Sequence, residues 1–586
     1  MSSGPSRSPA GVFGFMSGLK NSGTELSVPD LSEFRKRYPL TVASFGSLAD
    51  REKQLARIWR MDQRWRQLVE EGQPAPEEVL VKGAPPASLS VEAEFEIIYA
   101  GGALGLLHAA VMAHRYKRRV MVFDPEGVGR ADRDWNISDE ELSELERAGL
   151  FSREELDALV LNRCRSGFVK FHDAASRVKT PPLWMSGVCD VALDAKKLLD
   201  QAARKLKAGE SESVLMEGLR FVRCYVQPDR VLVLTEERAT KRLRLFAARL
   251  FIDAMGTDST VARQLQEGRS LTHVRPTVGT VARGFVRGRA ADQVDFRVGE
   301  ILVSREDAHD HRQLIWEGFA GNPARDEYTT YLFFYDALDS PADKSLLALF
   351  ERYFEKLPAY KRTGAQWRVL RPVFGYAPSS QHQGRLGRRR VAEDRVMLIG
   401  DAAGFSSPLA GSGLGPHLRH LKRLTHLVDL GLEADLLDQS ALAEISAAET
   451  GVAHLASLAE FLRPTPKSEA PAVNETLNAV MGALHSLDER VRRELFQNRM
   501  TLMALKNLLS RTVRLYPRII HRVREHLGAR GTLWWLVNIA EAGFSERREA
   551  RRLPLESGAA EDEEPAQKFA RYLHHYQRGD GAPDCD

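Results

Sequence analysis

The residues best suited to chemistry in this sequence lie between 396 and 415, VMLIGDAAGFSSPLAGSGLG. An apolar strand from Val396 to Ile399 leads to Asp401 and then to a glycine-rich turn at the start of a helix. Backbone N–H groups in such a turn, together with the positive end of the helix dipole, attract anionic or electron-rich ligands. We therefore predict a ligand site lined by Asp401 and by the following residues: Gly400, Pro408, Gly411, Gly413 and Gly415.

A second glycine turn lies within residues 95–124, FEIIYAGGALGLLHAAVMAHRYKRRVMVFD. It follows an apolar strand, opens a helix and precedes another apolar strand that ends in Asp124, which is the context of a dinucleotide-binding βαβ unit. Gly102 lets the backbone approach a pyrophosphate, and Gly105 lets the helix pack on the sheet. Asp124 stands at the strand end where an acid can accept hydrogen bonds from ribose hydroxyls.

The opening position of this fingerprint is Ala100 instead of glycine, so the turn depends on Gly101 beside it. Alone, the pattern is equally typical of a structural βαβ unit. A third apolar strand within residues 243–260 ends in D-A-M-G, which contains Gly256. Together with residues 396–415, these segments predict one nucleotide-binding domain assembled from distant parts of the chain.

The pattern G-D-A-A-G, S-P and G-x-G-x-G resembles the second fingerprint of FAD enzymes of the aromatic-hydroxylase and geranylgeranyl-reductase type. This resemblance implies FAD as cofactor, with Asp401 holding a ribityl hydroxyl and the following helix start facing the flavin ring. Relatives usually have G-A-D-G where this chain has Met255, so the hydroxylase signature associated with NADPH handling is absent. Arg130 is a candidate phosphate or flavin contact, and NAD(P)H is a candidate reductant.

Residues 275–375 alternate apolar and polar side chains in the manner of antiparallel strands. Within them Glu317 stands between Trp316 and Gly318 on an otherwise apolar strand. A carboxyl group on an apolar, aromatic-lined face tends to stay protonated, which makes Glu317 a candidate general acid. The alternation places Glu317 on the face opposite Trp316. The equally weighted alternative is an edge strand on which Glu317 faces solvent.

These patterns predict an α/β protein with a discontinuous, glutathione-reductase-like FAD-binding Rossmann domain, an antiparallel β-sheet substrate domain and a C-terminal helical region. We expect five parts: an N-terminal extension, partly disordered, at 1–90; the FAD-binding domain at 91–132, 185–265 and 390–430; the substrate domain at 133–184 and 266–389; a helical cap at 431–555; and a disordered tail at 556–586.

Composition restricts the classes of function. A chain of 586 residues predicts two or three domains, and 43% hydrophobic and 28% charged residues are typical of a soluble globular protein. The net charge of +4 gives no argument for a nucleic-acid partner. The four cysteines lack metal-ligand spacing and suggest no disulfide framework, so we predict no metal site and a reducing cytoplasm. We find neither a signal-peptide pattern nor a run of about 18 apolar residues.

The C-terminal region is rich in arginine. Between Arg490 and Arg530, eleven Arg or Lys residues accompany two acidic residues. Helical periodicity places one apolar set on one side: Leu505, Leu509, Val513, Tyr516, Ile520, Val523 and Leu527. The opposite side carries Arg511, Arg514, Arg518 and Arg522, and Pro517 must kink or split the helix. A basic amphipathic helix is typical of a peripheral membrane surface, here the inner face. The alternative is a helix that packs its apolar side on the protein core.

Several stretches together resemble the CruA/CruP-type lycopene cyclases, flavoproteins of bacteria and plastids: DWNIS (134–138), IDAMG (252–256), WEGFAG and TTYLFFY (316–335), GDAAGFSSPLAGSGLG and RHLKRL (419–424). The resemblance implies FAD, a lipophilic polyene substrate and redox-neutral cyclisation of a carotenoid end group. Those relatives typically carry G-D-S-S-G and S-P-V-S-F-G-G-F-G, whereas this chain has Ala402, Ala403 and Leu409. The alternative function is a net-redox FAD-dependent monooxygenase or reductase of another lipophilic substrate.

Overall fold

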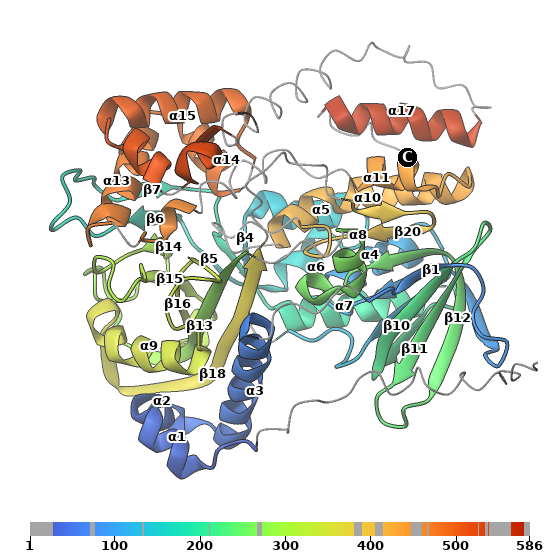
Figure 1. Cartoon of the computed structure of the whole chain (residues 1–586), viewed down its shortest axis with the longest axis horizontal. Helices are drawn as coiled ribbons and strands as arrows, with labels where there is room; N and C mark the ends of the chain where they lie inside the picture. Colours follow the sequence, from blue (N-terminus) through green and yellow to red (C-terminus); the bar gives the residue numbers. More distant parts are fainter. Residues whose placement is uncertain are drawn as a thin grey trace, which may run out of the picture.

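A computed structural model describes residues 27–70, 77–131, 134–209, 211–266, 272–379, 390–404, 414–446, 460–465, 468–497, 499–525, 527–533, 537 and 564–578, and the structural statements below concern these residues. Figure 1 shows two sheets beside each other, each covered by its own helices. We call them the first sheet and the second sheet in chain order. None of the described helices is both long and apolar enough to cross a lipid bilayer.

The first sheet has a parallel core with an antiparallel ribbon at one side. Neighbouring parallel strands are, in order, β9 (Val214–Glu217), β3 (Val120–Asp124), β2 (Val91–Ala100), β12 (Leu243–Asp253) and β20 (Val396–Leu398). The ribbon continues from β12 through β11 (Val231–Glu237) and β10 (Leu219–Val226) to the short β1 (Leu80–Lys82). Strand β1 therefore joins this sheet from within the expected N-terminal extension.

The second half of strand β2, from Ile97 to Ala100, is buried on both faces, as parallel strands usually are. Ile97 and Tyr99 belong to a core cluster that includes side chains of α4 (Leu104–His114), α7 (Ala195–Ala208) and α10 (Leu414–Glu433). Ile98 and Ala100 belong to the cluster on the opposite face. The apolar run in the sequence therefore reflects helices on one side of the sheet and further chain on the other.

The second sheet is mainly antiparallel and contains the strand that carries Glu317. Its order is β17 (Asp336–Ala337), β13 (His273–Phe285), β16 (Tyr328–Phe333), β15 (Ile315–Ala320), β14 (Val298–Val303), β6 (Ser166–Lys170) and β7 (Leu183–Met185), with β18 (Thr363–Ser379) paired to β13. One face is covered by α9 (Leu346–Tyr360), on which Trp316 stacks Tyr360 with ring centroids 4.4 Å apart. A small third sheet joins β4 (Trp135–Ile137), β8 (Val191–Leu193) and β5 (Val160–Arg163).

The N-terminal helices pack on the second sheet, below α9 in Figure 1. These are α1 (Leu31–Arg37), α2 (Pro39–Ser44) and α3 (Arg51–Glu70). Asp62 of α3 accepts hydrogen bonds from the backbone N–H groups of Leu346 and Leu347 at 2.7 and 3.1 Å, so it caps the start of α9. The Tyr376 hydroxyl on β18 also donates to Asp62, at 2.7 Å. Residues 27–70 are thus fixed to the body of the protein.

The C-terminal helices α13 (Ala472–His485), α14 (Glu489–Phe496) and α15 (Leu502–Leu515) lie at one end of the second sheet (Figure 1). Leu505, Tyr516 and Val523 are buried in one core cluster with Phe333 of that sheet. The expectation that the helix packs its apolar side on the core is therefore confirmed for these three residues. It is wrong for Ile520, which is 62% exposed, and for Arg522, which is buried. The helix stops before Pro517, and the next helical residues begin at a different rotation.

The expected disordered tail at 556–586 is wrong for residues 565–578. They form α17 (Pro565–Arg578), which packs along α10. Phe569 and Tyr572 are buried in the same cluster as α4 and α10, and the Tyr576 hydroxyl lies 3.1 Å from Nδ1 of His426. The acidic composition before this segment hid a short amphipathic helix with a partner far away in the sequence.

Candidate functional site

The carboxyl ends of four parallel strands meet at one edge of the first sheet. Strand register sets Ala100 beside Phe123, Asp253 beside Ala100, and Leu398 beside Asp253. The turns that follow these strands must therefore lie together, at the position where open α/β sheets bind their ligands. We call this place the glycine-turn edge and define it by residues 100–105, 124–130, 253–256 and 398–404.

Gly101 makes the tightest contact at the glycine-turn edge. Its φ is +113°, a conformation that side-chain-bearing residues rarely adopt, and a Cβ there would collide with the carbonyl oxygen of Ala254. A Cβ on Gly105 would lie 2.7 Å from the Cβ of Ala254. The glycines of the first turn thus allow α4 and the turn after β12 to approach each other closely. Ala100 is accommodated because it still belongs to β2.

Gly102 and Asp124 are joined directly. The Gly102 N–H donates to Oδ2 of Asp124 at 3.0 Å, and Oδ1 accepts from the N–H groups of Glu126 and Gly127 at 2.8 and 3.0 Å. A carboxylate has about four acceptor positions, so it retains capacity for a ribose hydroxyl. Asp124 also shapes the loop after β3, which the sequence pattern did not indicate.

The start of α4 has no side-chain cap. Its N-cap residue is Ala103, whose side chain makes no cap hydrogen bond. Ser, Thr, Asn or Asp is usual there because it satisfies N–H groups of the first turn. An uncapped helix start beside Gly102 is the arrangement that binds phosphate groups in dinucleotide folds.

The remaining predicted ligand residues separate into three groups. Gly400 (φ +59°) and Gly256 (φ +70°) lie at the glycine-turn edge together with Asp401. Gly415 lies in α10, where a Cβ would collide with the Glu141 carboxylate, so its smallness serves helix packing. Pro408, Gly411 and Gly413 lie outside the described residues.

Arg130 belongs to the loop after β3 and points away from the buried part of the edge. Its guanidinium donates to the Glu126 carbonyl oxygen at 2.8 Å, and its side chain is 63% exposed. The structure therefore places Arg130 at the rim of the glycine-turn edge, and its contact with a phosphate or flavin stays a prediction.

Glu317 lies on an internal strand. Its neighbours are Tyr331 on β16 and, across the other side of β15, residues of β14. The alternative of an exposed edge strand is therefore wrong. Trp316 packs on α9, whereas Glu317 lies on the other face, and its side chain is 15% exposed. The predicted alternation of Trp316 and Glu317 is confirmed.

Arg275 is the partner of Glu317 that the sequence did not reveal. The Arg275 guanidinium donates to Oε1 of Glu317 at 2.7 Å, and the Arg275 side chain is 4% exposed. The same guanidinium lies 3.4 Å from the ring centroid of Phe333. We expected apolar surroundings that would keep this acid neutral, and the structure instead places it in a buried ion pair.

Cys189 connects the second sheet with the start of α10. Burial raises the pKa of the Cys189 thiol well above its ordinary value, and the nearby negative charges of Glu141 and Glu317 raise it further. Glu141 lies in the first turn of α5 (Asp139–Arg147), accepts from the Ser138 N–H at 2.8 Å and pairs with Arg419 of α10. The Glu317 face is thus turned toward the beginning of α10.

Two buried histidines lie beneath the glycine-turn edge. Nδ1 of His108 in α4 is 2.8 Å from the Tyr99 hydroxyl, and His417 is fully buried in the second turn of α10. Burial, together with a smaller contribution from His417, lowers the pKa of His108 to about 3. Burial and the neighbouring His420 lower the pKa of His417 to about 4. Both imidazoles are therefore neutral at physiological pH.

Comparison with known proteins supports the fold. No protein-family model and no curated protein matches the sequence. A solved geranylgeranyl bacteriochlorophyll reductase-like protein from Thermoplasma acidophilum has a similar structure. The alignment covers 74% of this chain and 99% of that protein, with 12% sequence identity and a TM-score of 0.53. The halogenase PltM, solved with phloroglucinol and FAD, is also similar. The alignment covers 83% of this chain and 96% of PltM, with 14% sequence identity and a TM-score of 0.51. The predicted fold class is confirmed: the chain has the α/β fold of FAD-binding, Rossmann-type flavoproteins.

Proposed function

We propose that this chain is an FAD-dependent enzyme that acts on an apolar isoprenoid, in the manner of a lycopene cyclase. FAD is supported by the glycine-turn edge. Gly101 and Gly102 form a tight turn that packs against Ala254 and Val128, the uncapped α4 start suits a pyrophosphate, and Asp124 suits a ribose. Asp401 and Gly400 would hold the other half of the cofactor, at the carboxyl end of β20.

The observation that carries the reaction is the position of Glu317. It is a carboxylate on a sheet face that includes the aromatic residues Phe319, Tyr331 and Phe333. Cyclisation of a polyene end group begins with protonation of a double bond, passes through a carbocation and ends when a base removes a proton. Aromatic faces and a carboxylate stabilise a nearby cation in a site from which water is excluded.

The ion pair with Arg275 defines the role that Glu317 can take. A charged carboxylate stabilises the carbocation and accepts the final proton, and Arg275 holds it in place. The proton that is added to the double bond at the start must then come from an acid other than Glu317. This role replaces the general acid expected from the sequence. When bound, reduced flavin supplies an electron-rich ring that requires no net redox change.

The same ion pair favours a second candidate function. A carboxylate paired with a guanidinium has no proton to donate at the start of a cyclisation, so a net-redox monooxygenase or reductase of a lipophilic substrate also suits the site. In that reaction Arg275 and Glu317 would bind or orient the substrate, and NAD(P)H would be the reductant.

The test is expression in cells that accumulate lycopene, followed by pigment analysis. We expect cyclised pigment from the unaltered protein and none from Glu317→Gln, while both retain bound FAD by visible absorption. Glu306→Gln is the matched control, because Glu306 pairs with Lys356 at the same N···O distance of 2.7 Å but is 34% exposed. Cyclisation by Glu317→Gln at the normal rate would refute the assigned role. Stoichiometric consumption of NAD(P)H or oxygen with the substrate would establish the second candidate.

A further inference from the structure

The outer side of the C-terminal helices combines exposed apolar side chains with positive charge. In the described part of the chain eight large hydrophobic side chains are exposed, and four of them lie between residues 503 and 533. Met503 and Ile520 are each 62% exposed, and Leu515 is 54% exposed. Such clustering is unusual for a surface that only meets water.

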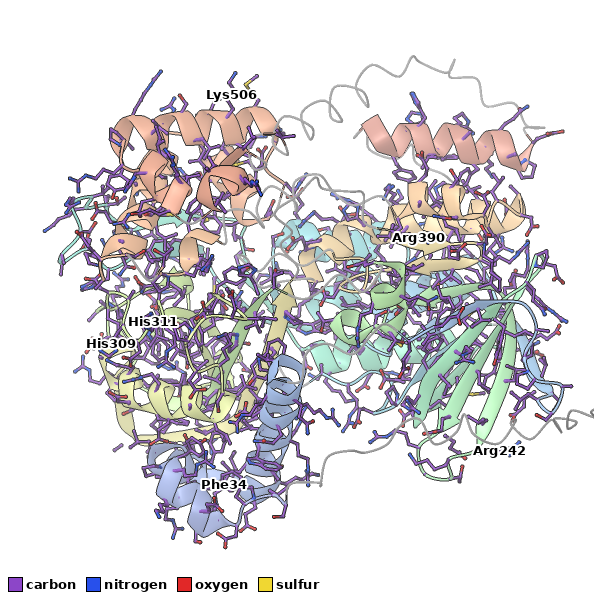
Figure 2. The ribbon with its side chains drawn as sticks, viewed as in Figure 1. Phe34, Arg242, His309, His311, Arg390 and Lys506 are labelled. Atoms are coloured by element: carbon purple, nitrogen blue, oxygen red, sulfur yellow. The ribbon has the colours of Figure 1, made fainter. Side chains whose placement is uncertain are left out.

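Basic residues alternate with these apolar side chains along the chain. Lys506, Arg514 and Arg518 are all exposed, and Figure 2 shows Lys506 on the outer side of α15, away from the second sheet. Within α15 the exposed positions 503, 506, 510 and 514 recur at helical spacing, whereas Ala504, Leu505 and Leu508 face the core. The sole acidic residue between 499 and 533 is Glu525, which pairs with Arg522.

We propose that this outer side docks on the surface of an anionic lipid bilayer. We name it the basic apolar surface and define it by six residues: Met503, Lys506, Arg514, Leu515, Arg518 and Ile520. Its cations complement acidic headgroups, and its apolar side chains enter the boundary between headgroups and acyl chains. The positive charge alone would not indicate a bilayer, because a polyanion in water could also pair with the basic side chains. Such a polyanion would leave Leu515 and Ile520 exposed to water, whereas a bilayer would bury them.

This surface differs from the one that sequence periodicity indicates. The periodic apolar side, apart from Ile520, packs in the core cluster against the second sheet, so those residues are unavailable to lipid. The exposed apolar residues lie instead at the start of α15, at its last residue and just after Pro517. Figure 1 shows α13 and α14 between α15 and the second sheet, so docking there would place these two helices between the second sheet and the bilayer. The proposal rests on these exposures alone and is independent of the reaction.

Vesicle flotation of the full-length protein tests the proposal. We expect the protein to float with phosphatidylcholine vesicles that contain phosphatidylglycerol, and to remain in solution with pure phosphatidylcholine. Each basic group near an anionic surface contributes about fivefold to binding, so Arg514→Glu/Arg518→Glu should weaken binding at least tenfold. Leu515→Ser/Ile520→Ser should weaken it severalfold at unchanged charge. Because these four side chains are exposed, the variants should keep the normal thermal midpoint.

Matched controls lie at the opposite end of the molecule. Lys241→Glu/Arg242→Glu changes the charge equally in the turn between β11 and β12, where the two side chains are 72% and 67% exposed and Figure 2 labels Arg242. Leu40→Ser removes another exposed apolar side chain. Neither control should alter flotation.

Three results would overturn the proposal. The unaltered protein would not float with acidic vesicles at physiological salt. The control charge reversal would weaken flotation as much as Arg514→Glu/Arg518→Glu. Alternatively, Leu515→Ser/Ile520→Ser would have no effect and a short DNA duplex would displace the protein, which would identify a general polyanion site.

Discussion

The ion pair between Arg275 and Glu317 gives a quantitative prediction. Arg275 is 4% exposed and Glu317 15%, so Arg275→Met leaves a largely desolvated carboxylate without its cation. Loss of one partner of a buried pair costs about 3–5 kcal/mol, and we expect about 3 because water can reach part of Glu317. In a domain of this size that corresponds to a fall in thermal midpoint of roughly 6–12 °C.

The double variant Arg275→Met/Glu317→Met separates electrostatics from packing. Both charges are then absent, so we expect most of the lost stability to return, with a coupling free energy of about 1–3 kcal/mol. Lys356→Met is the control, since the Lys356–Glu306 pair has the same 2.7 Å distance but is about one-third exposed; its cost should stay below about 1 kcal/mol. The assay is thermal unfolding followed by tryptophan fluorescence. Additive losses in the double variant would refute the reasoning.

Two further predictions concern the first sheet. Gly101→Ala should abolish FAD retention on gel filtration, because the new Cβ would collide with Ala254. Gly256→Ala should retain FAD, because Gly256 lies in open space, and its φ of +70° should lower the free energy of unfolding by only about 1–2 kcal/mol. Equal FAD content in the two variants would contradict this prediction. The pKa of His108 is about 3 and that of His417 about 4 in the folded protein, whereas both are 6.5 in the unfolded chain. Above pH 6.5 both imidazoles are neutral in the folded and the unfolded state, so burying them carries no cost of deprotonation. Their contribution falls as pH decreases toward 4, by roughly 2 kcal/mol each at pH 5. His417→Leu should make the thermal midpoint of unfolding less dependent on pH between 6.5 and 4. A midpoint that changes with pH as steeply as in the unaltered protein would refute this prediction.

Local patterns were sufficient to predict the parallel strands of the first sheet and the glycine turns that follow them. The strand, glycine turn, helix and strand of residues 95–124 are contiguous, so spacing alone predicts Gly102 in the turn after the first strand and Asp124 at the end of the second. The face of Glu317 was predictable for the same reason, because alternation along a strand is a local property. The position of Gly101 against Ala254 needed the third strand, which the sequence also revealed by its own apolar run.

Long-range partners were not predictable from this single sequence. Arg275 and Glu317 lie on β13 and β15, with β16 between them, and no local pattern specifies that pairing. Phe569 and Tyr572 stand in a short helix whose stability comes from contact with α10, whereas composition favoured disorder. Ile520 was misassigned because Pro517 resets the helical phase, and the new phase depends on tertiary packing.

The separation of β12 from β20 has a consequence for synthesis of the protein. β20 completes the parallel core beside residues 251–253, but residues 254–395 are translated between the two strands. At about 5–20 residues per second, the ribosome needs roughly 7–30 s to deliver β20 after β12 has emerged. During that time the end of β12 is an open strand edge, the kind of surface that pairs with other chains. Until residue 398 has left the exit tunnel, the end of β12 therefore remains a site at which the nascent chain can pair with another chain.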